Sequence, residues 1–257
     1  MTVAEYQGFN LSRECFVVTK LSLCLFSLLF VQAQDSGTLE AVTNRGELRC
    51  GVSGLPPGEL VEAEDGGLVG FYTEFCRAVA AAVLGDQEAV AYLPLSMAES
   101  FSALRRGDVD LLVGSVAQTV SRDAEVDFAP VVFHSASQHY APALRQGDSF
   151  WRDTVSWTIY TLIQAEEWGI DSANVGSLAD ATQSAAMLAR FLELEEALVA
   201  QLGLEPDALR RMIAQVGNYG EVYDRHLGPD ATLSLPRGPN RLWNEGGLLY
   251  APPFSAR

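Results

Sequence analysis

Residues 127–148 read DFAPVVFHSASQHYAPALRQGD, and this stretch decides the fold. An apolar run is followed by the polar patch HSASQ and then by a second strand-like run, HYAPALR, which stops at Gly147 and Asp148. Two strand-like runs with so short a connection predict an antiparallel hairpin. The sequence before the hairpin alternates strand and helix patterns, and the sequence after it is helical. The hairpin therefore marks the end of one α/β unit.

Upstream of the hairpin, short apolar strands alternate with helices. The first helix is rich in alanine and ends at Gly85. The second opens on Ser96, with Glu99 three residues later as in a capping box. This order predicts a mostly parallel sheet with right-handed crossovers. The predicted elements are strand 46–54, helix 74–86, strand 89–95, helix 96–108 and strand 109–115.

Downstream of the hairpin the sequence becomes helical. Residues 148–169 predict an amphipathic helix capped by Asp148, and a second such helix covers about 183–202. Pro206 suits the first turn of a third helix that runs to about Val216. The remaining tail is rich in Gly and Pro and is predicted to be irregular. The first helix places these apolar side chains on one face: Trp151, Val155, Ile159, Leu162 and Ile163.

The first 33 residues predict a signal peptide. Residues 21–31 form an uncharged apolar run that is too short to span a bilayer but typical of the core of a signal peptide. The tripeptide VQA that follows suits cleavage after Ala33. Because the segment before the apolar run is long and carries Glu5 and Glu14, an uncleaved amphipathic anchor is the alternative.

Composition narrows the function classes. The chain has 257 residues, of which 48% are hydrophobic, so it can bury a sizeable core. Its 33 acidic and 17 basic residues give a net charge of -16. This charge repels nucleic acid and anionic membrane surfaces, so we expect no nucleic-acid partner.

Cys50 and Cys76 are the two cysteines that remain after removal of the signal peptide. In an oxidising compartment a disulfide between them would close a loop of about 25 residues and stabilise the fold by about 3 kcal/mol. Two buried free thiols are the alternative, because cysteine is a common core residue and sequence does not give the distance between the two.

Most residue patterns that could carry chemistry are incomplete. His134 and His139 lie in the polar turn with no third metal ligand near them, which favours a solvated turn. The sequence lacks the Cys-x-x-Cys, Gly-x-Gly-x-x-Gly and Gly-x-Ser-x-Gly motifs of redox, dinucleotide-binding and hydrolase proteins. The acidic clusters 62–65 and 193–196 are typical of solvated faces. We therefore expect no metal, no cofactor and no enzyme activity.

One segment stands out from this background. GSVAQTVSRDAEVDFAP follows the third strand and brings Ser115, Thr119 and Arg122 to the carboxyl end of the sheet, where open α/β folds usually bind ligands. An arginine there can hold a carboxylate with two parallel hydrogen bonds. The alternative is a surface arginine paired with Asp123 or Asp127.

These motifs resemble the type II periplasmic solute-binding proteins of amino-acid ABC importers. The runs GELRCGVSGLPPG, FCRAVAAAVLGD, PLSMAESFSALRRGDVDLL and TVSRDAEVDFAP resemble the first lobe of that family. Residues 145–170 and 215–253 are similar to its general L-amino-acid-binding branch. In this family a strand like DFAP crosses into a second lobe of about a hundred residues, and a strand like HYAPALRQGD returns from it. Here the two strands are almost adjacent, so the second lobe is expected to be absent.

The resemblance implies a fold class and a domain organisation. The fold is expected to be α/β, a single type II periplasmic-binding-protein-like lobe with an antiparallel hinge hairpin, C-terminal helices and an irregular tail. We expect a signal peptide over 1–33, the solute-binding lobe with its hinge strands over 34–148, and a C-terminal helical extension packed on this lobe over 149–257.

The resemblance also implies a function and a site. We expect an exported, periplasmic substrate-binding component that binds an L-amino acid and works with an ABC permease in the inner membrane. Arg122 would bind the α-carboxylate, Ser115 and Thr119 would line the same loop, and Met97 would lie near the side-chain pocket. The pattern departs from the family at Glu59, at 116–118 and at Tyr72, and the carboxylate that would receive the ligand's ammonium belongs to the absent lobe.

A different class of function is the alternative. The lobe could be an interaction module that docks on a permease or forms a dimer, and an exposed apolar patch at Val131, Val132 and Phe133 would favour it. An enzyme on the same scaffold is the third interpretation, and it is the weakest because no acid-base pair is visible in the sequence.

Overall fold

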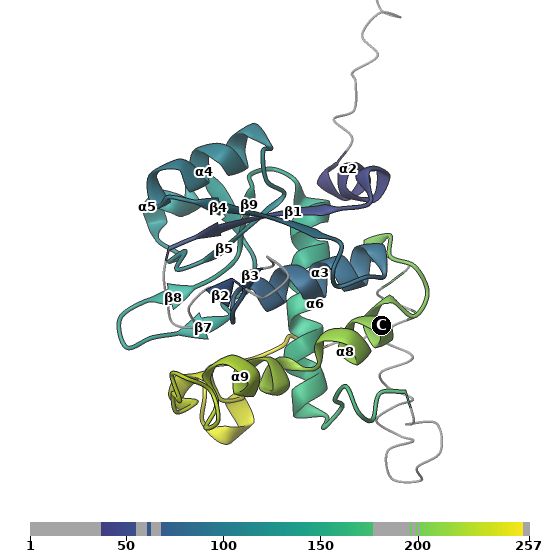
Figure 1. The fold of residues 1–257 in the computed structure, drawn as a ribbon, viewed down its shortest axis with the longest axis vertical. Helices are drawn as coiled ribbons and strands as arrows, with labels where there is room; N and C mark the ends of the chain where they lie inside the picture. Colours follow the sequence, from purple (N-terminus) through teal and green to yellow (C-terminus); the bar gives the residue numbers. More distant parts are fainter. Residues whose placement is uncertain are drawn as a thin grey trace, which may run out of the picture. The chain divides into compact units, whose positions relative to one another are not determined.

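The computed structural model describes residues 37–54, 61–62, 68–176, 196, 199 and 201–253. Five strands form one sheet in the order β4-β1-β5-β9-β6 (Figure 1). The first three strands of this order run parallel, and β9 is antiparallel to both of its neighbours. The prediction of a mostly parallel α/β lobe is therefore confirmed. The strand bounds are β1 Leu48–Ser53, β4 Val90–Leu95, β5 Leu111–Gly114, β6 Val126–Phe128 and β9 Ala143–Arg145.

The hinge hairpin is antiparallel along its length, as predicted. β6 pairs with β9, and further toward the turn β7 (Phe133–His134) pairs with β8 (His139–Tyr140). Each long strand expected from sequence is divided in two near a proline, Pro130 or Pro142. Proline has no backbone N–H to donate to a ladder, which accounts for the interruptions.

Helices cover both faces of the sheet. α3 (Thr73–Leu84) and α4 (Met97–Arg106) pack on β1, and each belongs to a different apolar cluster. The strand β5 contributes to both clusters, because Leu111 and Val113 face the α3 side and Leu112 faces the α4 side. The sheet thus has two buried faces, as expected for parallel strands with helical crossovers.

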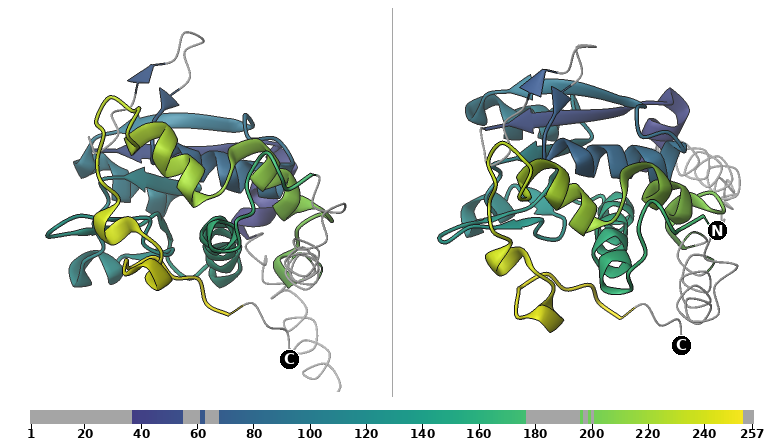
Figure 2. Two further views of the ribbon diagram at one scale, coloured as in Figure 1. Left: turned by 90° about the horizontal axis from the view of Figure 1, so that it is seen from below. Right: turned by 60° about the horizontal axis from the view of Figure 1, so that its bottom comes forward.

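The C-terminal helices extend the layer formed by α3. α6 (Ser149–Glu167) and α8 (Ala208–Val216) both contact α3, and α9 (Tyr219–Leu227) contacts α6 (Figure 2). The predicted cap of α6 is confirmed, since the Asp148 side chain accepts a hydrogen bond from the backbone N–H of Trp151 at 3.0 Å. All five apolar residues predicted for one face of α6 are buried.

Several expectations need correction. α2 (Thr38–Arg45) was not anticipated, and residues 219–227 form α9 where an irregular tail was predicted. A capping box explains this helix: Asn218 accepts from the backbone N–H of Glu221, and the Glu221 side chain accepts from the backbone N–H of Asn218. The shorter elements are β2 Val61–Glu62, β3 Leu68–Val69, α5 Val120–Asp123 and the 3-10 turns η2 Gly238–Asn240 and η3 Trp243–Glu245.

The apolar patch that would have favoured an interaction module is not exposed. Val132 and Phe133 are buried in the larger cluster, and Val131 is partly buried. The hydroxyl of Tyr219 on α9 donates to the carbonyl of Val132 at 2.8 Å, so the C-terminal region covers these residues. The condition that would have favoured the interaction module is therefore not met at these residues.

Some predicted features lie outside the described residues. These are the signal peptide over 1–33, Glu59, and most of the helix expected over 183–202. Within the described part of the chain, none of the helices combines the length and the hydropathy that crossing a bilayer would require.

Candidate functional site

Three parallel strands end at one edge of the sheet and bring their following loops together. Ser53 at the end of β1 is aligned with Leu95 of β4 on one side and with Gly114 of β5 on the other. The next residues along the chain are therefore neighbours in space. Ser115 and Met97 meet across Gly54 at this edge.

The two glycines at this edge allow the loops to approach closely. Gly114 has a φ of +118°, and a Cβ at this position would lie 2.0 Å from the carbonyl oxygen of Ser53. Gly54 has a φ of +75°, and its Cβ would lie 3.1 Å from that of Ser115. Any side chain at either position would push the loops apart. These glycines fix the spacing between Ser115 and Met97.

Arg122 lies on α5, just beyond this edge, with its guanidinium fixed by three contacts. Nη1 donates to the carbonyl of Ala117 at 2.8 Å, and Nη2 lies 3.8 Å from the sulfur of Met97. The guanidinium carbon is 5.1 Å from the ring centroid of Phe101, a cation-π distance. The arginine is partly buried. It is therefore oriented while its remaining N–H donors stay available.

The alternative of a structural ion pair is not supported by these contacts. Among the described residues, no carboxylate lies within ion-pair distance of Arg122. Asp127 instead accepts a hydrogen bond from the backbone N–H of Gly147 at 3.0 Å. A cation with no counterion among the described residues, at the carboxyl edge of an open sheet, is suited to an anionic ligand.

The hydroxyl groups of the loop have different roles. Thr119 is the N-cap of α5, where its Oγ1 lies 3.4 Å from the backbone nitrogen of Arg122 and 3.2 Å from the Ser121 hydroxyl. Ser115 donates its backbone N–H to the carbonyl of Ser53 at 3.0 Å. Thr119 thus positions the start of α5, and Ser115 holds its loop against β1.

The four residues predicted for the site are distributed along one edge. Met97 and Ser115 meet Gly54, Met97 reaches Arg122, and Thr119 caps the helix that carries the arginine. Ligand binding by these residues stays a prediction. Sequence reasoning missed Phe101, although its position four residues after Met97 on a helix placed both on one face.

Tyr72 lies at the N-terminal end of α3, close to the hinge. Its ring packs edge-on against that of Tyr140 on β8, with centroids 6.3 Å apart. Burial, with a smaller effect from Tyr140, raises the pKa of the Tyr72 hydroxyl well above its usual value. This tyrosine is therefore a neutral, packed residue, in contrast to the aspartate expected there from the family pattern.

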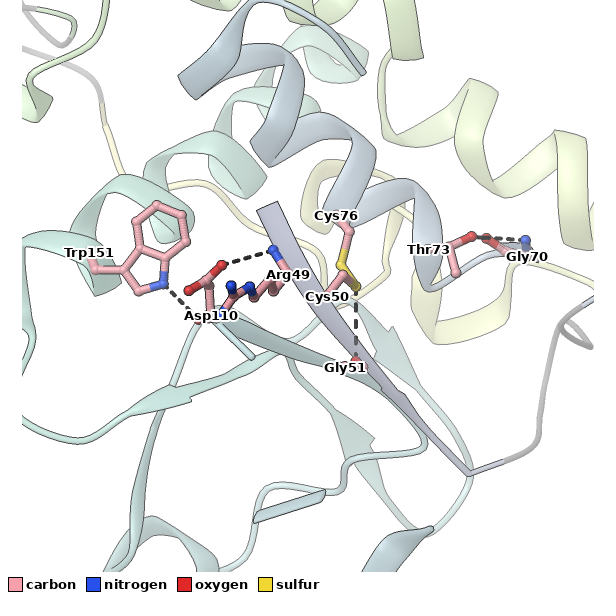
Figure 3. The surroundings of a disulfide bond; sticks show 8 residues. All are labelled: Arg49, Cys50, Gly51, Gly70, Thr73, Cys76, Asp110 and Trp151. Carbon is pink, nitrogen blue, oxygen red and sulfur yellow. Dashed lines mark hydrogen bonds between the residues drawn. A yellow bond between two sulfur atoms is a disulfide. The ribbon is translucent and has the colours of Figure 1, made fainter. Parts of the chain in front are cut away.

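A disulfide and a buried carboxylate secure β1 behind the site. Cys50 on β1 is bonded to Cys76 on α3 (Figure 3). Beside the disulfide, the carboxylate of Asp110 accepts from the backbone N–H of Arg49 at 2.8 Å and from the side chain of Arg45. The indole N–H of Trp151 donates to the Asp110 carbonyl at 2.9 Å, so α6 is joined to the same strand pair (Figure 3).

The fold defines a class of protein: it is a type II periplasmic-binding-protein-like lobe, and Arg122 lies at the carboxyl edge of its sheet. A sequence profile of bacterial extracellular solute-binding proteins, family 3, matches residues 48–173. YhdW of Escherichia coli K12, described as an amino-acid ABC transporter-binding protein, is 30% identical over 320 residues, which cover 86% of this chain and 94% of YhdW. The chain belongs to this family of solute-binding proteins.

Other relatives agree with this assignment. The glutamate/glutamine/aspartate/asparagine-binding protein BztA of Rhodobacter capsulatus is 29% identical, over 88% of this chain and 96% of BztA. The general L-amino acid-binding periplasmic protein AapJ of Rhizobium johnstonii is 29% identical, over 86% of this chain and 94% of AapJ. The names of these relatives thus agree in describing amino-acid-binding or amino-acid transporter-binding proteins.

A solved structure shares the fold. It is an ABC transporter periplasmic binding protein from Brucella ovis with glutathione bound. The TM-score is 0.77 at 26% identity, and the match covers 85% of this chain and 99% of the other.

The lengths of these alignments show that the chain is shorter than its relatives over the matched region. The alignment with YhdW extends over 320 positions but includes 86% of a 257-residue chain, or about 221 residues. About a hundred positions of the relative therefore have no counterpart here.

Proposed function

We propose that this chain is the extracytoplasmic binding component of an amino-acid ABC import system and that it binds the α-carboxylate of its ligand through Arg122. The observation that carries the proposal is the guanidinium of Arg122, which is held by Ala117 and Phe101 and has no carboxylate partner among the described residues. Family membership supports the transport role.

The other site residues fit a ligand held at one end. Ser115 and Thr119 place hydroxyl groups in the same loop as the arginine, and these can donate to the second carboxylate oxygen. Met97 and Phe101 provide the apolar surface beside it, along which the ligand side chain would lie.

A single lobe limits the affinity. In two-lobed binding proteins, closure removes water and surrounds both charges of the ligand. The gap of about a hundred positions in the alignments and the short turn between β7 and β8 both support the absence of a second lobe. One exposed charge-assisted contact contributes about 1.5 to 3 kcal/mol, whereas micromolar binding requires about 8. We therefore expect weak binding.

The proposal includes export to the periplasm, which the apolar run over 21–31 and the periplasmic relatives support. It also includes a permease partner, as the family implies. N-terminal sequencing of the exported protein should give a chain that begins near Gln34. A chain that begins at Met1 would contradict the cleavage.

The binding role is tested by an NMR titration that compares each amino acid with its α-carboxamide, which lacks the negative charge. The panel contains L-glutamate, L-glutamine, other L-amino acids, glutathione, and the α-carboxamide of each amino acid that binds. We expect the backbone signals of Ser115, Thr119 and Arg122 to shift with an amino acid and not with its carboxamide. Equal shifts with both would exclude Arg122 as a carboxylate site, and shifts with glutathione alone would change the ligand class.

A further inference from the structure

The turn of the hinge hairpin brings two histidines together. His134 on β7 and His139 on β8 are directly opposed in the antiparallel register, and their Nδ1 atoms lie 2.9 Å apart. The ring centroids are 4.9 Å apart, and His139 is exposed to solvent. Sequence separation alone gave no indication of this contact, because the five-residue spacing became a cross-strand pair only through the register of the hairpin.

This spacing matches the geometry of a metal ion with two imidazole ligands. Metal-imidazole bonds are about 2.0 to 2.1 Å long, so two such bonds at a right angle separate the nitrogens by about 2.9 Å. A right angle between neighbouring ligands is the preference of tetragonal Cu²⁺ and Ni²⁺. Small rotations of the two imidazole rings would turn the Nδ1 lone pairs away from each other, so that both point to a shared ion.

The hairpin holds both histidines in place before any ion arrives. The backbone N–H of His134 donates to the side-chain oxygen of Asn240 at 2.6 Å, and the Asn240 amide donates back to the His134 carbonyl at 3.0 Å. The turn between the strands is closed by Ser135, whose backbone N–H donates to the carbonyl of Gln138 at 2.9 Å. A prearranged pair of ligands loses little conformational freedom on binding.

We propose that His134 and His139 form a two-imidazole binding site for a divalent transition-metal ion of the Cu²⁺ type. Within the described residues, no group of three or more His, Cys, Asp or Glu side chains is arranged around a metal position. Water therefore fills the remaining coordination positions. The bound ion connects β7 to β8 at the turn, on the hairpin that in two-lobed relatives leads to the second lobe. By the order of divalent affinities, Cu²⁺ binds more tightly than Ni²⁺ or Zn²⁺.

The sequence makes this site easy to test. The chain has three histidines, and the third, His226, lies 2.9 Å from the carboxylate of Glu74 and is largely buried. The probe is Cu²⁺ alone, added to the untagged protein in a non-coordinating buffer, with calorimetry for affinity and electron paramagnetic resonance for the ligand atoms. We expect one saturable site whose spectrum shows two nitrogen donors.

Matched variants decide the outcome. His139→Ala removes an exposed ring, so the thermal melting temperature should be unchanged while Cu²⁺ affinity falls by about a hundredfold, the loss expected when a chelating partner is removed. His226→Gln should bind Cu²⁺ as the wild type does. Unchanged affinity and an unchanged spectrum in His139→Ala would overturn the proposal, and so would the absence of saturable binding in the wild type.

Discussion

Glu74 shows how one residue fixes the C-terminal helices to the lobe. It lies on α3 with 2% of its side chain exposed, and its carboxylate meets Arg225 and His226 of α9 at 2.8 and 2.9 Å. Burial alone would raise its pKa. The hydrogen bond with His226 and the positive charge of Arg225 outweigh this effect and lower the pKa of Glu74. The charged form is therefore the one that stabilises the fold.

Glu74→Gln should lower the free energy of unfolding at neutral pH by about 1.5 to 3 kcal/mol, the contribution of a hydrogen bond to a charged group. Because the folded pKa is lowered, this contribution is complete above the ordinary pKa of a glutamate and is lost as pH falls through the folded value. The difference between wild type and variant should shrink on acidification. Urea unfolding at several pH values measures it.

A surface carboxylate provides the control for this prediction. Glu125 pairs with Arg105, but 58% of its side chain is exposed. Glu125→Gln should change stability by at most about 1 kcal/mol. Equal effects of the two substitutions would show that the Glu74 cluster does not hold α9.

Among the helices and strands, the sequence predicted those that have a clear local pattern of apolar residues and caps. The strands and helices from 46 to 115 and the helix that Asp148 caps carry clear periodicity and caps, and the structure contains them. α9 was missed because Gly217 and Gly228 flank it and suggested a tail. Burial of Val132 was missed for the same reason, since its partner Tyr219 lies on α9.

The candidate site was predictable to a similar degree. The position of Arg122 at the carboxyl edge follows from the order of strands, which sequence shows. Its contacts with Ala117 and Phe101 depend on the path of the loop after β5, and the meeting of Ser115 with Met97 depends on the approach of β1 to β5 at Gly114. Local patterns do not encode such distances between elements.

The N-terminal cap of α9 is open to a direct test. Asn218 and Glu221, which form it, are the sequence feature that indicates this helix. Asn218→Ala removes the acceptor for the backbone N–H of Glu221 and should cost about 1 kcal/mol. Asn218→Ser keeps a capping acceptor but loses the amide that donates to the Ile170 carbonyl at 2.8 Å, so it should recover only part of the stability. Thermal unfolding separates these variants. Equal stability of Asn218→Ser and Asn218→Ala would contradict the capping role.

The disulfide joins β1 to α3, on the face of the sheet that carries the larger apolar cluster. Cys50→Ala with Cys76→Ala should lower the unfolding free energy by about 3 kcal/mol, mostly because the unfolded chain is no longer constrained. Ligand binding at the opposite end of β1 should be unchanged if the fold is retained. Denaturant unfolding of the double variant, compared with the wild type under oxidising conditions, checks the value.

In the whole molecule, the described residues from 37 onward form one α/β sheet with its C-terminal helices. Two features bear on the proposed absence of a second lobe: the hairpin turn between β7 and β8, and the gap of about a hundred positions in the alignment with YhdW. The C-terminal helices pack on the α3 face of the sheet. They leave Arg122, on α5, partly exposed. We expect the proposed site to bind its ligand through one solvent-exposed contact, which salt would screen.

Whether Arg122 binds the α-carboxylate is decided by an NMR titration that measures the dissociation constant of an L-amino acid for the wild type, Arg122→Ala and Arg105→Ala. Arg105 is an exposed arginine of α4 paired with Glu125, so it controls for a general loss of positive charge. We predict a dissociation constant near the millimolar range for the wild type and Arg105→Ala, weaker at high salt, and no binding by Arg122→Ala. Micromolar affinity would contradict weak binding through a single contact, and equal binding by Arg122→Ala would contradict the role of Arg122.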